Sequence, residues 1–241
     1  MNKTGDQMCR VFLPGNLREA VFIARLNRFV AEIRVDGQTE LAHVPSSGRM
    51  AELLYPGARV FAVLQTNPGA RLKRRILLAE MDGFPVSVDS LLPNRLVHRA
   101  LAQGCLPEIQ GYRGIKREAA YGAGRFDFFL TEGPGKGCYL EVKSVTLVED
   151  GVALFPDAPS ERGARHLEEL AAARREGYRA VVLFVIQRED ARCFKPNSRQ
   201  DPRFGLGLSA AALAGVEVLA RRCRVSLREV ALDVTVPVLL I

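Results

Sequence analysis

Two neighbouring stretches, residues 124–128 and 139–144, constrain this chain more than any other part of its sequence. Apolar side chains alternate along the first stretch, which predicts a strand, and a Gly-Pro-Gly turn leads into a second strand. Side chains two residues apart on a strand share a face, so Glu141 and Lys143 lie together. If the two strands pair in a suitable register, Asp127 reaches the same face. The sequence therefore predicts two carboxylates and one ammonium at the end of a short sheet.

This grouping of charges favours a metal site. Two adjacent carboxylates resist joint ionisation, and a divalent cation removes that penalty. Mg²⁺ binds oxygen ligands, usually one or two carboxylates with substrate phosphates and water. We therefore expect Asp127 and Glu141 to hold Mg²⁺ or Mn²⁺, and Lys143 to position the attacking water in phosphodiester hydrolysis. Glu118, on the strand predicted over 115–121, is a candidate additional ligand or base, although the pattern favours an exposed acid on that strand. The structural alternative is a surface ion pair between Lys143 and one of the acids, which contributes little to stability.

The same stretch resembles the PD-(D/E)XK nuclease signature, with Phe126 where that family often has proline. Flanking motifs are similar to those of the sugar fermentation stimulation protein family. They are Glu141-Val142-Lys143-Ser144, Phe155-Pro156-Asp157-Ala158, Glu161-Arg162-Gly163, Gly48-Arg49-Met50, Pro93-Asn94-Arg95-Leu96 and Gly215-Val216-Glu217-Val218. The resemblance covers nearly the whole chain after about residue 12. Ser46-Ser47 departs from the Asn-Thr that is usual in that family.

The resemblance implies an α+β or α/β protein of two domains. Residues 1–84 form an OB-like β-barrel, of which 1–12 are a loose tail, and residues 85–241 form a PD-(D/E)XK nuclease-like domain with a mixed central sheet flanked by helices. The residue pattern agrees with this division. Alternating apolar residues over 29–35 and the turn Asp36-Gly37 predict a hairpin in the first part. In the second part we predict a helix over 93–102 and a buried, parallel central strand over 180–186.

Basic residues are the candidate contacts to DNA. The formal net charge of +7 favours a polyanionic partner, with nucleic acid first. The predicted nucleic-acid-binding residues are Ser47, Arg49, Arg71, Lys73, Arg74, Arg117 and Arg125. By resemblance, Asp157, Glu161 and His166 shape the mouth of the site, with helix capping by Ser160 or Asp157 as the structural alternative. Duplex and single-stranded DNA both stay open as partners.

Cysteine usage and hydropathy indicate the compartment. Five scattered cysteines with no Cys-x-x-Cys pair predict reduced thiols and neither a zinc site nor a disulfide framework. We find no N-terminal apolar run typical of a signal peptide and no stretch approaching the ~18 apolar residues of a membrane span. The sequence therefore predicts a cytoplasmic protein that does not enter a membrane.

Three functions fit these patterns. The first is a Mg²⁺- or Mn²⁺-dependent nuclease acting on DNA. The second is a non-catalytic DNA-binding regulator of sugar-utilisation genes with a vestigial metal site. The third is a sugar-metabolism accessory protein in which the charged residues form a structural ion network. A complete set of two carboxylates and a lysine favours the first over the others, and nothing in the sequence marks a sugar site.

Overall fold

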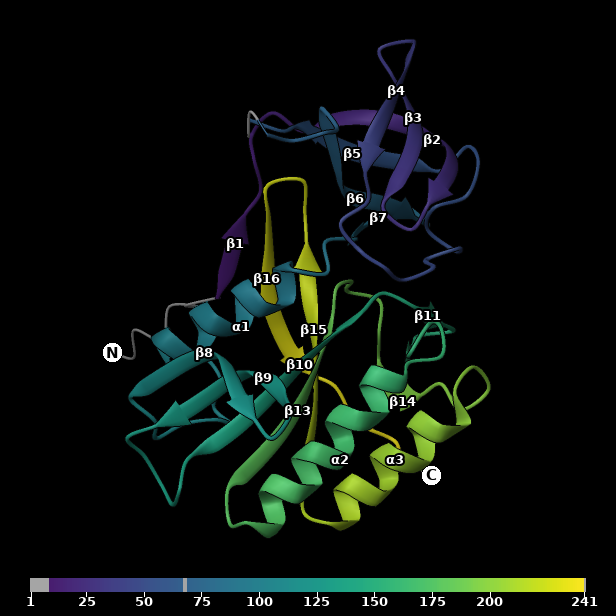
Figure 1. The fold of residues 1–241 in the computed structure, drawn as a ribbon. Helices are drawn as coiled ribbons and strands as arrows, with labels where there is room; N and C mark the ends of the chain where they lie inside the picture. The colour runs from purple at the N-terminus through teal and green to yellow at the C-terminus, as the bar shows by residue number, and fades with distance from the viewer. Residues whose placement is uncertain (1–8, 67–68, 241) are drawn as a thin grey trace, which may run out of the picture.

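The computed structural model describes residues 9–66 and 69–240, and it has two parts (Figure 1). A β-barrel forms one part, and a mixed sheet with helices on both faces forms the other (Figure 1). The barrel contains β2 (Arg18–Asn27), β3 (Val30–Val35), β4 (Gln38–His43), β5 (Arg59–Leu64), β6 (Arg74–Met81) and β7 (Phe84–Ser87). The chain then forms α1 (Leu92–Gln103), β8 (Gly114–Tyr121), β9 (Gly124–Thr131), β10 (Cys138–Val145), β11 (Val148–Glu149), β12 (Val152–Phe155), α2 (Glu161–Arg175), β13 (Arg179–Ile186), β14 (Cys193–Pro196), α3 (Pro202–Leu213), β15 (Glu217–Val225) and β16 (Glu229–Thr235).

The barrel closes because β4 pairs with β6 as well as with β3. The strand order is β4-β3-β2-β5-β6-β7, and the parallel β4–β6 pairing joins the ends of the first five strands. Alternate residues of β3 (Ala31, Ile33 and Val35) are buried inside it. Asp36 and Gly37 have positive φ of 49° and 80°, as a two-residue hairpin turn between twisted strands requires. The OB-like barrel predicted from the sequence is confirmed.

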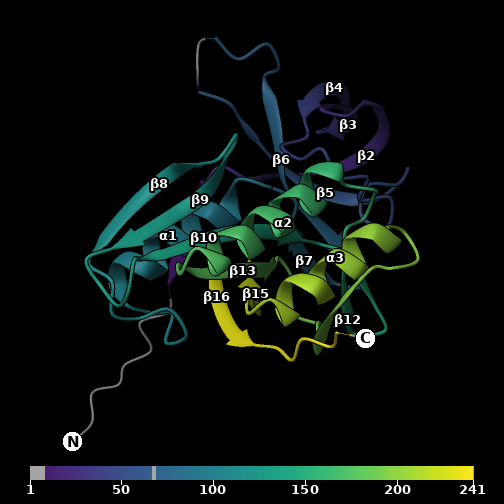
Figure 2. The same ribbon diagram turned by 60° about the horizontal axis from the view of Figure 1, so that its bottom comes forward.

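The second sheet has the order β1-β16-β15-β13-β10-β9-β8, in which β1 spans Arg10–Phe12. β13 lies at its centre and pairs in parallel with β10 and with β15, and residues 180–186 are completely buried. Successive side chains of β13 enter opposite cores. Leu183 packs with the apolar side chains of α1, whereas Phe184 packs with those of α2 and α3. Helices α2 and α3 lie side by side on one face of the sheet (Figure 2). Taken in chain order, α1, β8, β9, β10, α2 and β13 form the αβββαβ core that the nuclease resemblance implies, with the short strands β11 and β12 of a separate sheet between β10 and α2. The predicted fold class is confirmed.

Two boundaries differ from the prediction. Residues 10–12 are not a loose tail, because they form β1 (Arg10–Phe12), which pairs antiparallel with β16 near the C-terminus. β7 pairs with β6, so the sheet of the barrel extends through Ser87, beyond the predicted limit at residue 84. Residues 1–8 of the predicted tail lie outside the described residues. No helix of the described residues is long and apolar enough to cross a membrane.

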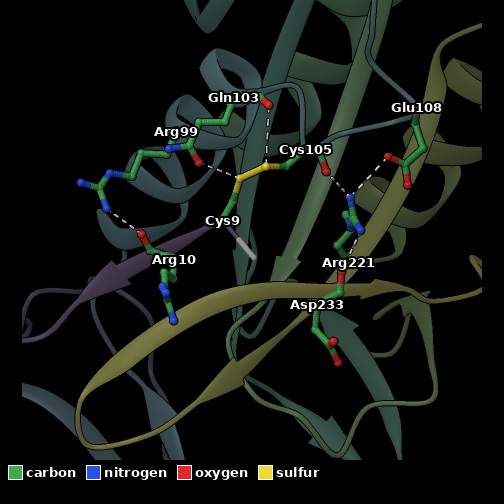
Figure 3. The surroundings of a disulfide bond; sticks show 8 residues. All are labelled: Cys9, Arg10, Arg99, Gln103, Cys105, Glu108, Arg221 and Asp233. Carbon is green, nitrogen blue, oxygen red and sulfur yellow. Dashed lines mark hydrogen bonds and ion pairs between the residues drawn. A yellow bond between two sulfur atoms is a disulfide. The ribbon is translucent and has the colours of Figure 1, made fainter. Parts of the chain in front are cut away.

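The prediction that all the cysteines are reduced is wrong for two of them. Cys9, just before β1, forms a disulfide with Cys105, just after α1 (Figure 3). The two residues are 96 positions apart in the sequence, and the pairing of β1 with β16 brings them together, which no cysteine spacing could indicate. Cys138, Cys193 and Cys223 are free.

Candidate active site

Glu141 and Lys143 project from the same face of β10, as predicted from their spacing. Only 4% of Glu141 and 9% of Lys143 are exposed, because β10 lies between β9 and β13 and α2 covers this face. Nζ of Lys143 donates to Oε1 of Glu141 at 2.7 Å. A buried pair of this kind compensates the desolvation of both charges, and removing one partner leaves the other uncompensated.

His166 joins this pair from α2. Its Nδ1 contacts Oε1 of Glu141 and lies 3.3 Å from Nζ of Lys143, and Nε of Arg162 donates to its Nε2 at 3.4 Å. These contacts fit the tautomer that carries its proton on Nδ1 and donates it to Glu141. The α2 helix is fixed at its start by Ser160, whose side chain accepts from the backbone N–H of Gly163. His166 is therefore part of the charged cluster itself, and not only of its mouth as predicted.

Asp127 comes from β9 and is held from two directions. The pairing of β9 with β10 ends at Phe128–Leu140, so the strands separate beside Asp127. Its side chain takes the place of a backbone partner: Oδ2 accepts from the N–H of Val142 at 2.8 Å. Oδ1 accepts from Nδ2 of Asn94, on α1, at 2.6 Å. Asp127 thus lies against β10 next to Glu141, with a contact from the helix on the other side of the sheet.

The two carboxylates have opposite pKa shifts. Burial, and then the negative charge of Glu141, raise the pKa of Asp127 to about 6. Burial also acts to raise the pKa of Glu141, but the hydrogen bond from His166 and the charge of Lys143 outweigh it, and the net shift is downward. Glu141 is therefore held ionised, whereas an ionised Asp127 carries an electrostatic cost that a cation beside it would relieve.

The donor atoms fit a hard divalent cation that is also bound by water and substrate. All hydrogen bonds to the Glu141 carboxylate go to Oε1, and Oε2 takes none from the described residues. Within residues 9–66 and 69–240, no group of three or more His, Cys, Asp or Glu side chains is arranged to hold a metal by itself. Two carboxylates with further oxygens from substrate and water are a set that Mg²⁺ accepts.

Comparison with known proteins agrees with this fold. Residues 91–229 match the family described as the sugar fermentation stimulation protein RE domain, and residues 23–88 match the SfsA N-terminal OB domain. The chain belongs to the sugar fermentation stimulation protein family. A homolog from Desulforamulus reducens is 52% identical, over 95% of this chain and 94% of its own. A homolog from Moorella thermoacetica is 45% identical, over 89% of this chain and 93% of its own. The structure of Pyrococcus furiosus SfsA in complex with Ca²⁺ superposes with a TM-score of 0.86 at 30% identity, covering 94% of this chain and 97% of that one.

In this SfsA-family chain, the predicted additional ligand Glu118 does not join the carboxylate pair. Its φ is 49°, which departs from the regular strand conformation, and the residue is exposed on β8. Its side chain lies 3.9 Å from Arg125 as a surface ion pair, and no described hydrogen bond or ion pair links it to Asp127 or Glu141. The structure therefore leaves Glu118 outside the cluster.

The predicted DNA contacts are dispersed over the surface. Arg74 is unsuited to the role because it is buried and makes two hydrogen bonds to Glu40, at 2.7 and 3.1 Å. Arg71 and Lys73 are exposed and line a hollow on the barrel that shares no lining residue with the one beside Lys143. The remaining exposed members lie on β8, on β9 or in the barrel loop, and they are Arg117, Arg125, Ser47 and Arg49. Glu161 is the exposed first residue of α2.

The loop that carries Ser47 and Arg49 is fixed by Arg25, which the sequence analysis did not single out. The guanidinium of Arg25 donates to four backbone carbonyls, those of Arg28, Ser46, Gly48 and Arg49, at 2.6 to 2.9 Å. Across the domain boundary, the backbone N–H of Met50 donates to Oδ2 of Asp157 at 3.3 Å. Asp157 thus joins the barrel loop to the segment before α2.

Two further residues that support the site are not among the predicted site residues. Asn94, in the motif Pro93-Asn94-Arg95-Leu96, donates to Asp127, and Arg162, in Glu161-Arg162-Gly163, donates to His166 four residues later on α2. These motifs are the sequence signal that points to both residues. Asn94 and Asp127 lie on different elements, and periodicity does not predict which helix contacts which strand.

Proposed function

We propose that this protein binds DNA and hydrolyses its phosphodiester bonds with the help of Mg²⁺ or Mn²⁺. The observation that carries the proposal is the meeting of Asp127, Glu141 and Lys143 where β9 and β10 separate, with Oε2 of Glu141 unused by the described residues. Charge that develops on phosphorus is stabilised best by groups fixed before the reaction, and all three side chains are held by hydrogen bonds.

Asp127 and Glu141 are the residues that would hold the cation. Such an ion polarises a phosphoryl oxygen and lowers the pKa of bound water. Calcium in the P. furiosus SfsA structure supports the view that this family accepts a hard divalent cation. The contact of His166 with Oε1 fixes the orientation of Glu141 and directs Oε2 away from that hydrogen-bond cluster.

Lys143 has two tasks in this proposal. Its ammonium lies 2.7 Å from Oε1 of Glu141, so it offsets negative charge at the carboxylate pair when a phosphate approaches. Its remaining N–H groups can donate to an attacking water or to a phosphoryl oxygen. The net charge of +7 supplies the general attraction to the polyanion.

A second candidate is a DNA-binding regulator without cleavage activity. It is favoured by the near-complete burial of Glu141, Lys143 and His166, which satisfy one another as a closed network would. Such a network would stabilise the fold without acting on a substrate.

The deciding experiment compares cleavage by the wild type, Asp127→Asn, Glu141→Gln and Lys143→Met on labelled single-stranded and duplex DNA, with Mg²⁺ or Mn²⁺. The control is Glu19→Gln, which removes an exposed barrel acid paired with Arg59. Under the nuclease proposal each site variant loses about a hundredfold or more in rate, whereas the control does not. Binding is measured separately in Ca²⁺. Binding without cleavage by any protein supports the regulator, and equal cleavage by the wild type and Glu141→Gln refutes the nuclease.

A further inference from the structure

A pocket of about 360 Å³ lies between the barrel and the second domain, and Lys143 of the candidate active site is one of its lining residues. The barrel contributes residues 46–48 and Arg28. The second domain contributes residues 142–147, at the end of β10, and residues 154–160, which lead into α2. Lys143 is among the lining residues, so any group in this pocket is adjacent to the charged cluster.

The walls of the pocket are fixed from both domains. Arg25 holds the barrel loop through its four carbonyls, and Asp157 accepts from the N–H of Met50 in that loop. The opposite wall is held by Asn197, whose backbone N–H donates to the carbonyl of Phe155 at 2.8 Å and whose Nδ2 donates to that of Pro156 at 3.1 Å. A pocket with fixed walls loses little entropy when a ligand enters.

The lining offers polar side chains that have no hydrogen-bond partner among residues 9–66 and 69–240. Thr146 is only 9% exposed, yet its side chain makes no hydrogen bond to any described residue. Ser47 is exposed, and its hydroxyl is also unpaired within the described part of the chain. The guanidinium of Arg28 is exposed and forms no ion pair with a described residue. These unpaired hydroxyls and this guanidinium are available to bond to a ligand in the pocket.

The remaining lining suits a base with its phosphate. Phe155 and Leu147 form an apolar wall of the pocket. The ring of Phe155 packs against the rings of Phe184 and Phe204. The one carboxylate of the lining, Asp157, is turned toward the barrel loop, where its Oδ2 meets the N–H of Met50. An apolar wall with a few hydroxyl groups and a cationic side chain, here Arg28 or Lys143, is the usual composition of a small-ligand pocket.

We propose that this pocket receives one unpaired nucleotide of the nucleic-acid substrate and thereby sets the adjoining phosphodiester beside Lys143. The volume lies near the lower end of the range for small-ligand pockets, which suits a single nucleotide and excludes a base pair within a continuous duplex. The substrate class is therefore a strand with unpaired nucleotides, such as a single strand, an overhang or a flap. This inference rests on the proposed function, because it names the substrate of the same site.

The test measures fluorescence anisotropy of a labelled oligothymidylate and of a blunt duplex, in EDTA and again in Ca²⁺, so that no cleavage is needed. Ala158→Phe fills the pocket with a ring, and Thr146→Val removes one hydroxyl at nearly constant shape. The matched control is Ala210→Phe, which adds the same ring to the exposed face of α3. We expect Ala158→Phe to weaken oligothymidylate binding about tenfold and Thr146→Val to weaken it roughly fivefold. Duplex binding and the control should stay within twofold of wild type.

A second measurement decides the matter if Ala158→Phe does not fold. Oligothymidylate carrying one 5-iododeoxyuridine is irradiated with the wild-type protein, and the crosslinked peptide is identified by mass spectrometry. A crosslink within residues 142–160 or 46–50 supports the inference, and a crosslink elsewhere overturns it. Unchanged oligothymidylate binding by folded Ala158→Phe also overturns it. Cleavage of a blunt duplex with no effect of the pocket variants would refute this inference alone, whereas pocket-dependent binding without cleavage would refute the nuclease proposal alone.

Discussion

Asn94 is the residue whose substitution tests the architecture of the site most directly. Its Nδ2 donates to Oδ1 of Asp127 at 2.6 Å, and that carboxylate is largely buried. A hydrogen bond to a charged group contributes ~1.5–3 kcal/mol to stability. Asn94→Ala removes it, and the better helix propensity of alanine returns at most ~0.7 kcal/mol. The net loss is about 1–2 kcal/mol, which lowers the melting temperature of a chain of this size by ~2–8 °C.

The assay is a double-mutant cycle with Asp127→Ala, followed by thermal or urea unfolding in EDTA. If Asn94 stabilises the protein through Asp127, Asn94→Ala costs about 1–2 kcal/mol in the wild-type background. In the Asp127→Ala background the carboxylate is gone, so the same substitution should be neutral or slightly stabilising. An equal cost in both backgrounds would refute the reasoning, since it would mean that Asn94 acts through α1 alone. In the cleavage assay of the proposed nuclease, we expect Asn94→Ala to lower the rate about 10- to 100-fold.

Three further predictions concern other parts of the fold. Gly48→Ala places a Cβ 2.6 Å from Oδ2 of Asp157 and should lower the unfolding free energy by ~1–3 kcal/mol; a variant as stable as wild type would contradict this contact. Replacing Cys9 and Cys105 by serine should cost ~2–4 kcal/mol under non-reducing conditions, whereas reductant should destabilise the wild type and leave the variant unchanged. Burial raises the pKa of Cys138 to about 12, so at pH 8 its thiol is protonated; mass spectrometry of native, iodoacetamide-treated protein should show it unlabelled, and rapid labelling would argue against its burial.

The elements that repeat with a clear period were predictable from sequence. The alternation over 29–35, the turn at Asp36-Gly37 and the helix that ends at Gly104 all appear where they were expected. Each is decided by local geometry: strand side chains alternate, positive φ suits the turn, and glycine ends a helix. The edges of the two sheets were less predictable, because β1 and β7 are short and are fixed by the strands beside them.

The residues of the candidate site also divide into those whose position followed from local geometry and those whose position did not. That Glu141 and Lys143 share a face follows from two covalently linked residues on one strand, so sequence alone was sufficient. Glu118 lies apart from them as the exposed strand acid that the sequence favoured, whereas its positive φ, which interrupts the regular alternation of β8, was not predictable. The prediction that Arg74 contacts DNA is unsupported because its side chain is buried against Glu40. Arg74 lies in a run of basic residues, and only the pairing of β4 with β6 that closes the barrel decides which of them is buried.

The amino-acid sequence by itself determined the strands with a clear apolar period, the paired charges on β10 and the family. Only the tertiary structure decided that Asn94 and His166, from helices on opposite faces of the sheet, hold the two carboxylates, and that a barrel loop completes the pocket beside them. The physical reason is the range of the forces involved. Backbone geometry fixes the direction of a side chain within its own strand, whereas the docking of helices, loops and the Cys9–Cys105 link depends on apolar burial summed over the whole chain.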